Sequence, residues 1–299
     1  MVSSLKTDHR MKLLETQKFL KKLELQEFPQ PEIVQLNYPV LLCHGYGALA
    51  SVIKPSPMHE VCMLMRQHGV IAFAPNIVPY AKIETRAAEW VKKIEQLSEK
   101  YKFEKINVIA HSMAGLDMRY ALNHSDIHYK VASLTTVASP HRGTSLAELV
   151  LTTPELLQEK LGEMFDWFGN SMYPKGKSDA VGAVQQLTRE YVRETFNPAN
   201  PDHEDIAYYS YSAAVGKGTG EPLNPIYRYQ NQHIYEHEGP NDSFVSVESA
   251  KWGTHVKTAP LSHLEQIKIA VSKERTPKYE KFWFGVLEQI SREKKMVNE

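Results

Sequence analysis

Short apolar runs alternate with longer segments of helical period through the first half of the chain. The apolar runs, each short enough for a buried strand, are Tyr38–His44, Val70–Ala74, Lys105–Ala110 and Val131–Ala138. The helical segments between them are Met58–His68, Thr85–Tyr101 and a stretch from Ser112 to about Leu122. Such alternation is typical of βαβ units, so we expect a mainly parallel sheet with helices on both faces.

Residues 145–200 interrupt this rhythm. The stretch is rich in large apolar side chains, and Thr152 and Thr153 precede Pro154 as helix start signals. We expect a helical cap that is inserted into a single domain spanning residues 1–299. The alternative is that the same side chains pack as ordinary core.

The rest of the chain resumes the alternation less regularly. Strand-like runs occur at Ala207–Ala213 and Pro225–Tyr235, and a helix is expected over about Lys278–Lys294. Residues 1–28 mix charges with scattered leucines, which favours a partly amphipathic helix. They lack the apolar core of a signal peptide, and no run in the chain is apolar enough to span a bilayer. We therefore expect a cytoplasmic protein, with secretion left open.

Charge and cysteine content narrow the class of partner. The 299 residues carry 35 Lys plus Arg and 35 Asp plus Glu, so the formal net charge is zero. A neutral chain has no bulk electrostatic attraction to nucleic acid, and we expect no nucleic-acid partner. The two cysteines, Cys43 and Cys62, are too few for a disulfide scaffold.

A serine stands at the junction of an expected strand and an expected helix. In Ala110-His111-Ser112-Met113-Ala114, small residues lie two positions before and after the serine. A nucleophile elbow needs this arrangement, because the strained turn brings strand and helix close together. The alternative is a serine that caps the N-terminus of a helix. We predict Ser112 as a nucleophile.

The run His44-Gly45-Tyr46-Gly47 follows the first expected strand. Acyl transfer needs N–H donors aimed at the developing oxyanion, one from the residue after the nucleophile and one from an early loop. These donors would be the backbone N–H groups of Met113 and Tyr46. The alternative for the second is a plain glycine-rich turn.

A serine nucleophile needs a base, and the base needs an orienting acid. In α/β-hydrolases the acid and then the histidine follow the serine along the chain. Asp242 lies in a turn of the segment GPNDSF, and His263 lies in LSHLEQ. Taken singly, they are equally typical of an exposed turn aspartate and a surface histidine.

Four blocks of sequence together resemble the bacterial triacylglycerol lipases of the Pseudomonas and Burkholderia type. The blocks are YPVLLCHGYG, KINVIAHSMAGLDMRYAL, LTTVASPHRGTSLAE and NDSFVSVESAKWG with SHLEQ. A weaker match is QQLT with ETFN, at Gln185–Thr188 and Glu194–Asn197. The resemblance covers about Tyr38 to Ala270.

This resemblance implies an α/β-hydrolase fold, with Ser112 as nucleophile, Asp242 as acid and His263 as base. It implies Tyr46 and Met113 as oxyanion donors. His141 and Arg142 match a block of the family that we regard as structural, and we assign them no catalytic role.

The chain departs from the family at two places. Ala110 and Ala114 replace glycines of the elbow. The family often binds a structural calcium near the histidine, but the ligand position two residues after it is Glu265. The second acidic ligand can only be Glu221. We assign no metal and no cofactor, and leave calcium dependence open.

The segment His233-x-x-Glu236-His237 matches an inverted zinc-protease pattern. That chemistry requires a helix, which places both histidines on one face. The flanking residues favour a strand and a turn, so we reject the zinc site.

These observations predict a hydrolase that cleaves carboxylic esters, with acylglycerols as the expected substrates and transient contact of the cap with lipid. Alternatives are a short-chain carboxylesterase, a phospholipase or thioesterase, and an acyltransferase. An inactive hydrolase fold that serves as a binding module is the non-enzyme alternative.

Overall fold

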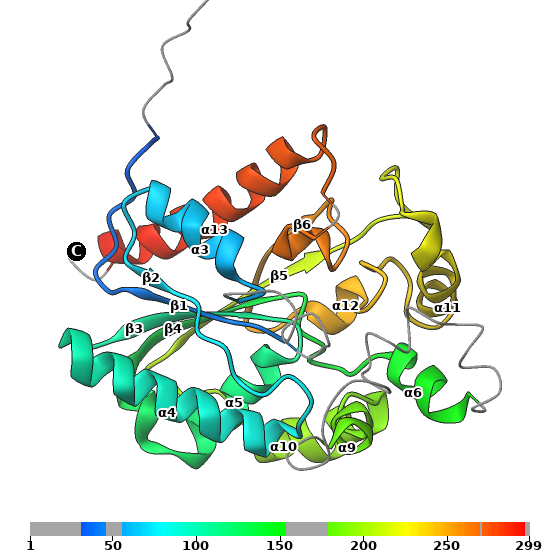
Figure 1. The fold of residues 1–299 in the computed structure, drawn as a ribbon. Coiled ribbons are helices and arrows are strands. Elements are labelled where there is room, and N and C mark those ends of the chain that lie inside the picture. Colours follow the sequence, from blue (N-terminus) through cyan, green and yellow to red (C-terminus); the bar gives the residue numbers. More distant parts are fainter. Residues whose placement is uncertain (1–30, 46–55, 154–178, 270, 297–299) are drawn as a thin grey trace, which may run out of the picture. The chain divides into compact units, whose positions relative to one another are not determined.

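The computed structural model describes residues 31–45, 56–153, 179–269 and 271–296 (Figure 1). Residues from Ile33 onward form one compact unit. The expected N-terminal helix, Tyr46 and most of the apolar part of the expected cap lie outside the described residues.

In the described residues, six strands form one sheet in the order β2-β1-β3-β4-β5-β6. All neighbouring pairs are parallel, which confirms the predicted sheet. The strands are β1 (Val40–Cys43), β2 (Ala72–Phe73), β3 (Ile106–His111), β4 (Val131–Val137), β5 (Ala207–Ala213) and β6 (Thr254–Ala259).

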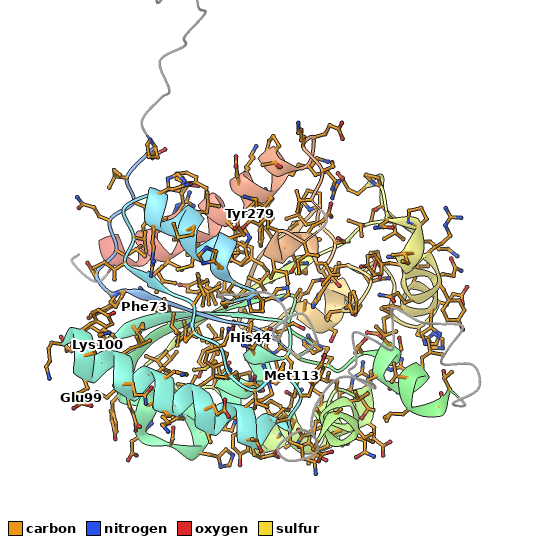
Figure 2. All side chains as sticks on the ribbon, viewed as in Figure 1. His44, Phe73, Glu99, Lys100, Met113 and Tyr279 are labelled. Carbon is orange, nitrogen blue, oxygen red and sulfur yellow. The ribbon has the colours of Figure 1, made fainter. Side chains whose placement is uncertain are left out.

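Helices cover both faces of this sheet (Figure 1). On one face lie α3 (His59–Gln67) and α13 (Thr276–Met296), and on the other lie α4 (Ile83–Tyr101) and α5 (Ala114–His124). Side chains fill the space between each layer and the sheet (Figure 2).

The strands divide their side chains between two cores because successive residues point to opposite faces. Val40 and Leu42 belong to the core that contains Trp283 of α13. Leu41 and Cys43 belong to the core that contains Trp90 of α4. The strands are apolar on both faces for this reason, as parallel strands between helices are.

The remaining short elements lie in the connections between strands and, for the last 3₁₀ turn, in the segment between β6 and α13. They are α6 (Ser145–Thr152), α9 (Ala180–Gln185), a π-helix (Tyr191–Phe196), α10 (Asn197–Ala199), α11 (Arg228–Glu238), α12 (Val247–Ala250) and 3₁₀ turns at Asp126–Lys130, Pro225–Tyr227 and Glu265–Ile267. The described parts of residues 145–200 are thus largely helical. Thr144 caps α6 by accepting a bond from the Leu146 N–H.

The local structure corrects one expected element and adds one that was not expected. The segment Pro225–Tyr235 is not a strand but a 3₁₀ turn that leads into α11. Thr152 is the last residue of α6, and the helix that Thr152 and Thr153 were expected to start lies outside the described residues. Strand β6 has no counterpart among the expected elements, because five of its six residues are exposed or half-buried and form no apolar run.

Two further features concern cysteines and membranes. Cys43 and Cys62 are both free and buried. Within the described residues, no helix is both long enough and apolar enough to cross a bilayer.

Candidate active site

Ser112 sits in the tight turn between β3 and α5. Its φ is +59°, a left-handed conformation that a residue with a side chain adopts only when its surroundings enforce it. The Ser112 N–H donates to the Val137 carbonyl at 2.9 Å, and the Gly115 N–H donates to the Ser112 carbonyl at 3.1 Å. The strand-to-helix junction therefore has the strained geometry of a nucleophile elbow.

Two glycines make the room that the elbow needs. A Cβ on Gly115 would lie 2.3 Å from Ser139 Oγ, and a Cβ on Gly45 would lie 2.5 Å from Ser112 Cβ. The close approach therefore falls at Gly115, one residue after the position where the usual pattern has glycine. Ala110 and Ala114 are fully buried.

The predicted acid and base are in direct contact. His263 Nδ1 lies 2.7 Å from Asp242 Oδ2, and both side chains are buried. The Phe244 and Val245 N–H groups donate to Asp242 Oδ1 at 3.0 and 2.8 Å. These two backbone donors fix the orientation of the Asp242 side chain, and its second oxygen lies where it can accept a hydrogen bond from His263 Nδ1.

Helix α11 anchors the turn that carries Asp242. Asn231 donates to Asn241 Oδ1 at 2.8 Å, and Asn241 returns a bond to the Asn231 carbonyl at 3.0 Å. Gln230 donates to the Ser243 carbonyl at 2.7 Å. The buried face of α11 is therefore polar, so it gives no apolar periodicity in the sequence. Its amides hold the turn that carries Asp242.

A second link joins the acid to the serine turn. Gln266 Nε2 donates to Asp242 Oδ2 at 2.9 Å, and Gln266 Oε1 lies 3.1 Å from His111 Nε2. Since the amide oxygen accepts, His111 donates from Nε2. Burial, followed by the nearby His263, lowers the pKa of His111 well below its ordinary value.

Through this link His111, which precedes the predicted nucleophile, lies beside His263, the predicted base. The rings of His111 and His263 lie 4.6 Å apart, and Ser112 follows His111 directly. Sequence analysis missed His111 and Gln266, although one precedes Ser112 and the other lies three residues after His263. The assignment of the three roles stays a prediction.

Of the two predicted oxyanion donors, Met113 lies within the described residues and Tyr46 does not. Met113 is buried and stands immediately before α5, with its carbonyl accepting from the Leu116 N–H at 2.9 Å. Tyr46 lies outside the described residues. The loop before it is anchored by His44, whose Nε2 accepts from the Ile77 N–H at 3.2 Å and whose Nδ1 donates to the Gly45 carbonyl.

Other blocks of the lipase resemblance form a structural framework. Arg119 of α5 donates to Asn197 Oδ1 and to the Asn200 carbonyl, both at 2.8 Å, and stacks on Trp252 at 3.5 Å. Arg142 donates to the carbonyls of Glu248 and Lys251. These contacts tie residues 197–200 and 248–252 to α5 and to the loop after β4.

The two acids considered for calcium, Glu265 and Glu221, do not face an open cation site. Both are ion-paired with Arg275, whose guanidinium lies between them. A calcium ion takes six to eight oxygen ligands, and here the guanidinium fills that space. These residues do not fit a bound calcium.

The His233–His237 pair lies on α11, so the helix that zinc chemistry requires is present after all. Their ring centroids are 4.3 Å apart, but His233 Nε2 lies 3.3 Å from the Ser145 carbonyl and His237 Nδ1 lies 2.8 Å from the His233 carbonyl. Among the described residues, no three His, Cys, Asp or Glu side chains are grouped to hold a metal.

Comparison with known proteins agrees with the fold. Residues 71–153 match the model of a family described as "alpha/beta hydrolase of unknown function (DUF915)". The structure superposes on a metagenomic carboxyl esterase with a TM-score of 0.67 and 18% identity, covering 90% of this chain and 80% of the esterase.

Two curated relatives are triacylglycerol lipases. Triacylglycerol lipase 2 of Saccharomyces cerevisiae is 30% identical over 212 residues, which cover 68% of this chain and 59% of the yeast protein. A Pseudomonas fragi triacylglycerol lipase is 24% identical over 263 residues, covering 78% of this chain and 89% of the lipase. These matches confirm the predicted resemblance to lipases.

Proposed function

The chain belongs to the α/β-hydrolase superfamily, and on that basis we propose that it hydrolyses carboxylic esters through Ser112, His263 and Asp242. The observation that carries the proposal is the buried His263–Asp242 pair, which lies against His111 of the serine elbow. A serine held at positive φ beside an oriented imidazole is the arrangement that acyl transfer requires.

The first half of the reaction forms an acyl-enzyme. His263 takes the proton of the Ser112 hydroxyl as Oγ attacks the ester carbonyl carbon. The Met113 N–H, together with the N–H of Tyr46, stabilises the oxyanion. The tetrahedral intermediate then collapses as His263 gives the proton to the departing alkoxide.

The second half releases the acid. Water attacks the acyl-enzyme and gives its proton to His263, and the collapse of the second tetrahedral intermediate returns that proton to Ser112. Asp242 stays ionised throughout and stabilises the imidazolium that forms in each half.

We propose acylglycerols as the substrate class, because the curated relatives named above are triacylglycerol lipases. The chain spans 59% of the length of the yeast relative, so the substrate of the whole yeast protein is not transferred as a fact. Contact of the cap with lipid belongs to the same proposal, and the cytoplasmic location stays a prediction from the sequence.

The test is hydrolysis of p-nitrophenyl esters from acetate to palmitate, with wild type and Ser112→Ala. We expect wild type to cleave them and Ser112→Ala to lose activity by several orders of magnitude while remaining folded. Preference for long chains supports a lipase, and preference for acetate or butyrate indicates a short-chain carboxylesterase. Transfer to an added alcohol in preference to water indicates an acyltransferase.

A fluorophosphonate probe separates the enzyme from a binding module. Such probes react with activated serines, so wild type should be labelled at Ser112 and the alanine variant should not. A folded wild type that is neither labelled nor active would contradict the proposal.

A further inference from the structure

Arg275, just before α13, contacts two other segments of the chain. Its guanidinium contacts both carboxylate oxygens of Glu265, Glu221 Oε2 at 3.0 Å and the Pro260 carbonyl at 2.5 Å. The Arg275 side chain is 12% exposed, and that of Glu265 is 10% exposed. A planar group with five donors matches this set of acceptors.

Two of these contacts enclose the segment that carries His263. Pro260 follows β6 and Glu265 opens the next 3₁₀ turn, so the histidine lies between the two points that Arg275 holds. Glu265 also accepts from the Ser262 N–H at 2.7 Å. The carboxylate thereby connects the guanidinium to the backbone beside His263.

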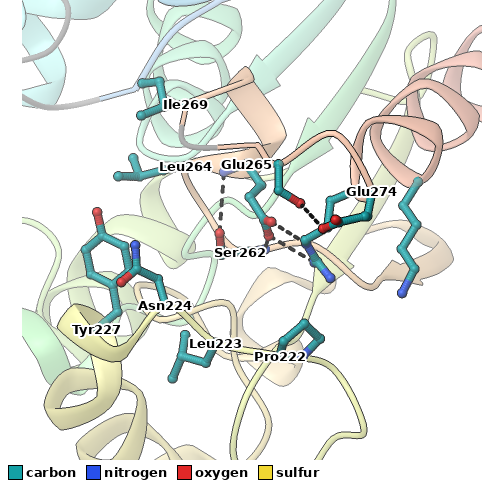
Figure 3. A pocket seen from close by; sticks show the side chains of 12 residues that line it. Pro222, Leu223, Asn224, Tyr227, Ser262, Leu264, Glu265, Ile269 and Glu274 are labelled. Carbon is teal, nitrogen blue, oxygen red and sulfur yellow. Dashed lines mark hydrogen bonds and ion pairs between the residues drawn. The ribbon is translucent and has the colours of Figure 1, made fainter.

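The same segment borders a cavity of about 510 Å³ (Figure 3). Ser262 and Leu264, which flank His263, line it, and so do Glu265 and Arg275. Leu261 and Leu264 pack into the core, and the His263 N–H donates to the Asp242 carbonyl at 3.0 Å, so these contacts hold the inner side of the turn. On the side that borders the cavity, the restraint comes from the bonds to Arg275.

We propose that Arg275 is a positioning residue, a cation built into the chain that holds the Pro260–Glu265 turn and thereby sets His263 against Asp242. The catalytic part of this inference rests on the proposed function. Because the guanidinium supplies the positive charge between Glu221 and Glu265, activity should need no divalent cation.

The expected consequence follows from the short contact between base and acid. His263 must stay 2.7 Å from Asp242 and in reach of the nucleophile, and a misplacement of about 1 Å costs about 100-fold in rate. Arg275→Gln should therefore lower kcat by about 10- to 100-fold with KM within about twofold. Arg275→Lys should keep part of kcat, because lysine supplies a positive charge beside Glu265 but lacks the several fixed N–H donors of the guanidinium.

Lys278 offers a matched control. It lies one helical turn further along α13 and pairs with Glu221 at 2.7 Å, but none of its described contacts reaches the Pro260–Glu265 turn. Lys278→Gln removes a charge of the same sign from the same carboxylate and should leave kcat unchanged.

The experiment measures kcat and KM for wild type and the three variants, together with thermal unfolding and hydrogen–deuterium exchange of peptides over residues 260–269. We expect faster exchange in that segment for Arg275→Gln alone. Equal kcat and equal exchange in Arg275→Gln and wild type would overturn the proposal, as would a fall in Tm with kcat per folded molecule unchanged.

Two further arms separate this inference from the proposed function. Dialysis of wild type against EDTA should leave activity unchanged, and a loss that calcium restores would overturn the internal-cation role. If wild type cleaves no ester, the proposed function fails, while the exchange comparison still decides whether Arg275 holds the turn.

Discussion

Ser112 keeps a left-handed backbone although it carries a side chain, and the residues around it make this conformation tolerable. Residues in such conformations cost about 1–3 kcal/mol each and persist where the surrounding structure enforces them. Here the enforcement comes from the Val137 carbonyl and from the tight approach at Gly115.

Gly115→Ala should destabilise the protein by about 1–3 kcal/mol, because the new Cβ would overlap Ser139 Oγ. Urea unfolding measures the change. Gly220→Ala is the control, since nothing lies within 4 Å of a Cβ there. Adding Ser139→Gly should restore part of the loss, and a fully stable Gly115→Ala would show that the elbow is looser than described.

Asp242→Asn should lower kcat by about four orders of magnitude with the fold intact. An amide oxygen can still accept from Phe244 and Val245, but the amide lacks the charge that stabilises the imidazolium. Steady-state kinetics and circular dichroism measure the two effects. Asp202→Asn, which changes an exposed aspartate beside Trp252, should be neutral.

At the residue level, chain order and local pattern were enough to select side chains that the structure brings together, while their catalytic roles stay a prediction. Asp242 and His263 were predicted in this way, and they are in contact. Gln266 and His111 were missed because their link spans 155 positions of sequence and no motif encodes it. Arg275 was missed because no motif includes it and because it brings Glu265, ten residues away, together with Glu221, 54 residues away.

At the scale of elements, a buried ion pair joins α4 to α5. Arg86 Nε donates to Asp117 Oδ2 at 2.9 Å, and both side chains are fully buried. The same guanidinium donates to the carbonyls of His44 and Val78. It therefore fixes the loop after β1 as well as the helix pair.

Arg86→Met should destabilise the fold by about 3–5 kcal/mol, since it leaves Asp117 buried without its cation. The free energy of unfolding in urea measures this. Lys268→Met is the comparison, because its pair with Glu60 is 39% and 49% exposed and should contribute less than about 1 kcal/mol. If Arg86→Met and Lys268→Met lowered the free energy of unfolding equally, burial of the ion pair would not determine its contribution to stability.

The elements themselves were predictable where periodicity was apolar. Helices α3, α4 and α5 and strands β1, β3, β4 and β5 lie close to their expected bounds. Helix α11 was taken for a strand because its buried face consists of Gln230, Asn231 and Ile234, of which two are polar. Only the contact of these amides with the Asp242 turn explains their burial.

At the scale of the whole molecule, three buried histidines should make the fold sensitive to acid. Burial and then Arg86 lower the pKa of His44 to about 3. Burial also lowers the pKa of His111 and His141 well below 6.5. All three are neutral in the folded chain, whereas the unfolded chain binds protons near pH 6.5.

Below about pH 6.5 the unfolded state therefore holds more protons, and stability falls as pH falls. Each histidine contributes about 1.4 kcal/mol per pH unit until its folded-state pKa is reached, about 3 for His44. Urea unfolding at about pH 7 and about pH 5 should show a smaller difference for His44→Gln than for wild type. His237→Gln, at an exposed position, should behave as wild type.

The parallel sheet was predictable as a whole because alternation of apolar runs and helical segments permits few other architectures. The order of the strands in the sheet was not predictable, because it depends on which face of the sheet each connecting helix covers.

That strand order also governs how the chain acquires its shape. Neighbours β4 and β5 are separated by residues 138–206, and their pairing requires closure of that long loop. The strands that hold Ser112 pair over shorter separations, whereas Asp242 and His263 lie beyond β5. We expect refolding to be slow and Ser112 to come within reach of His263 only in the last kinetic phase. On the proposed function, an incomplete chain emerging from the ribosome should then cleave no ester.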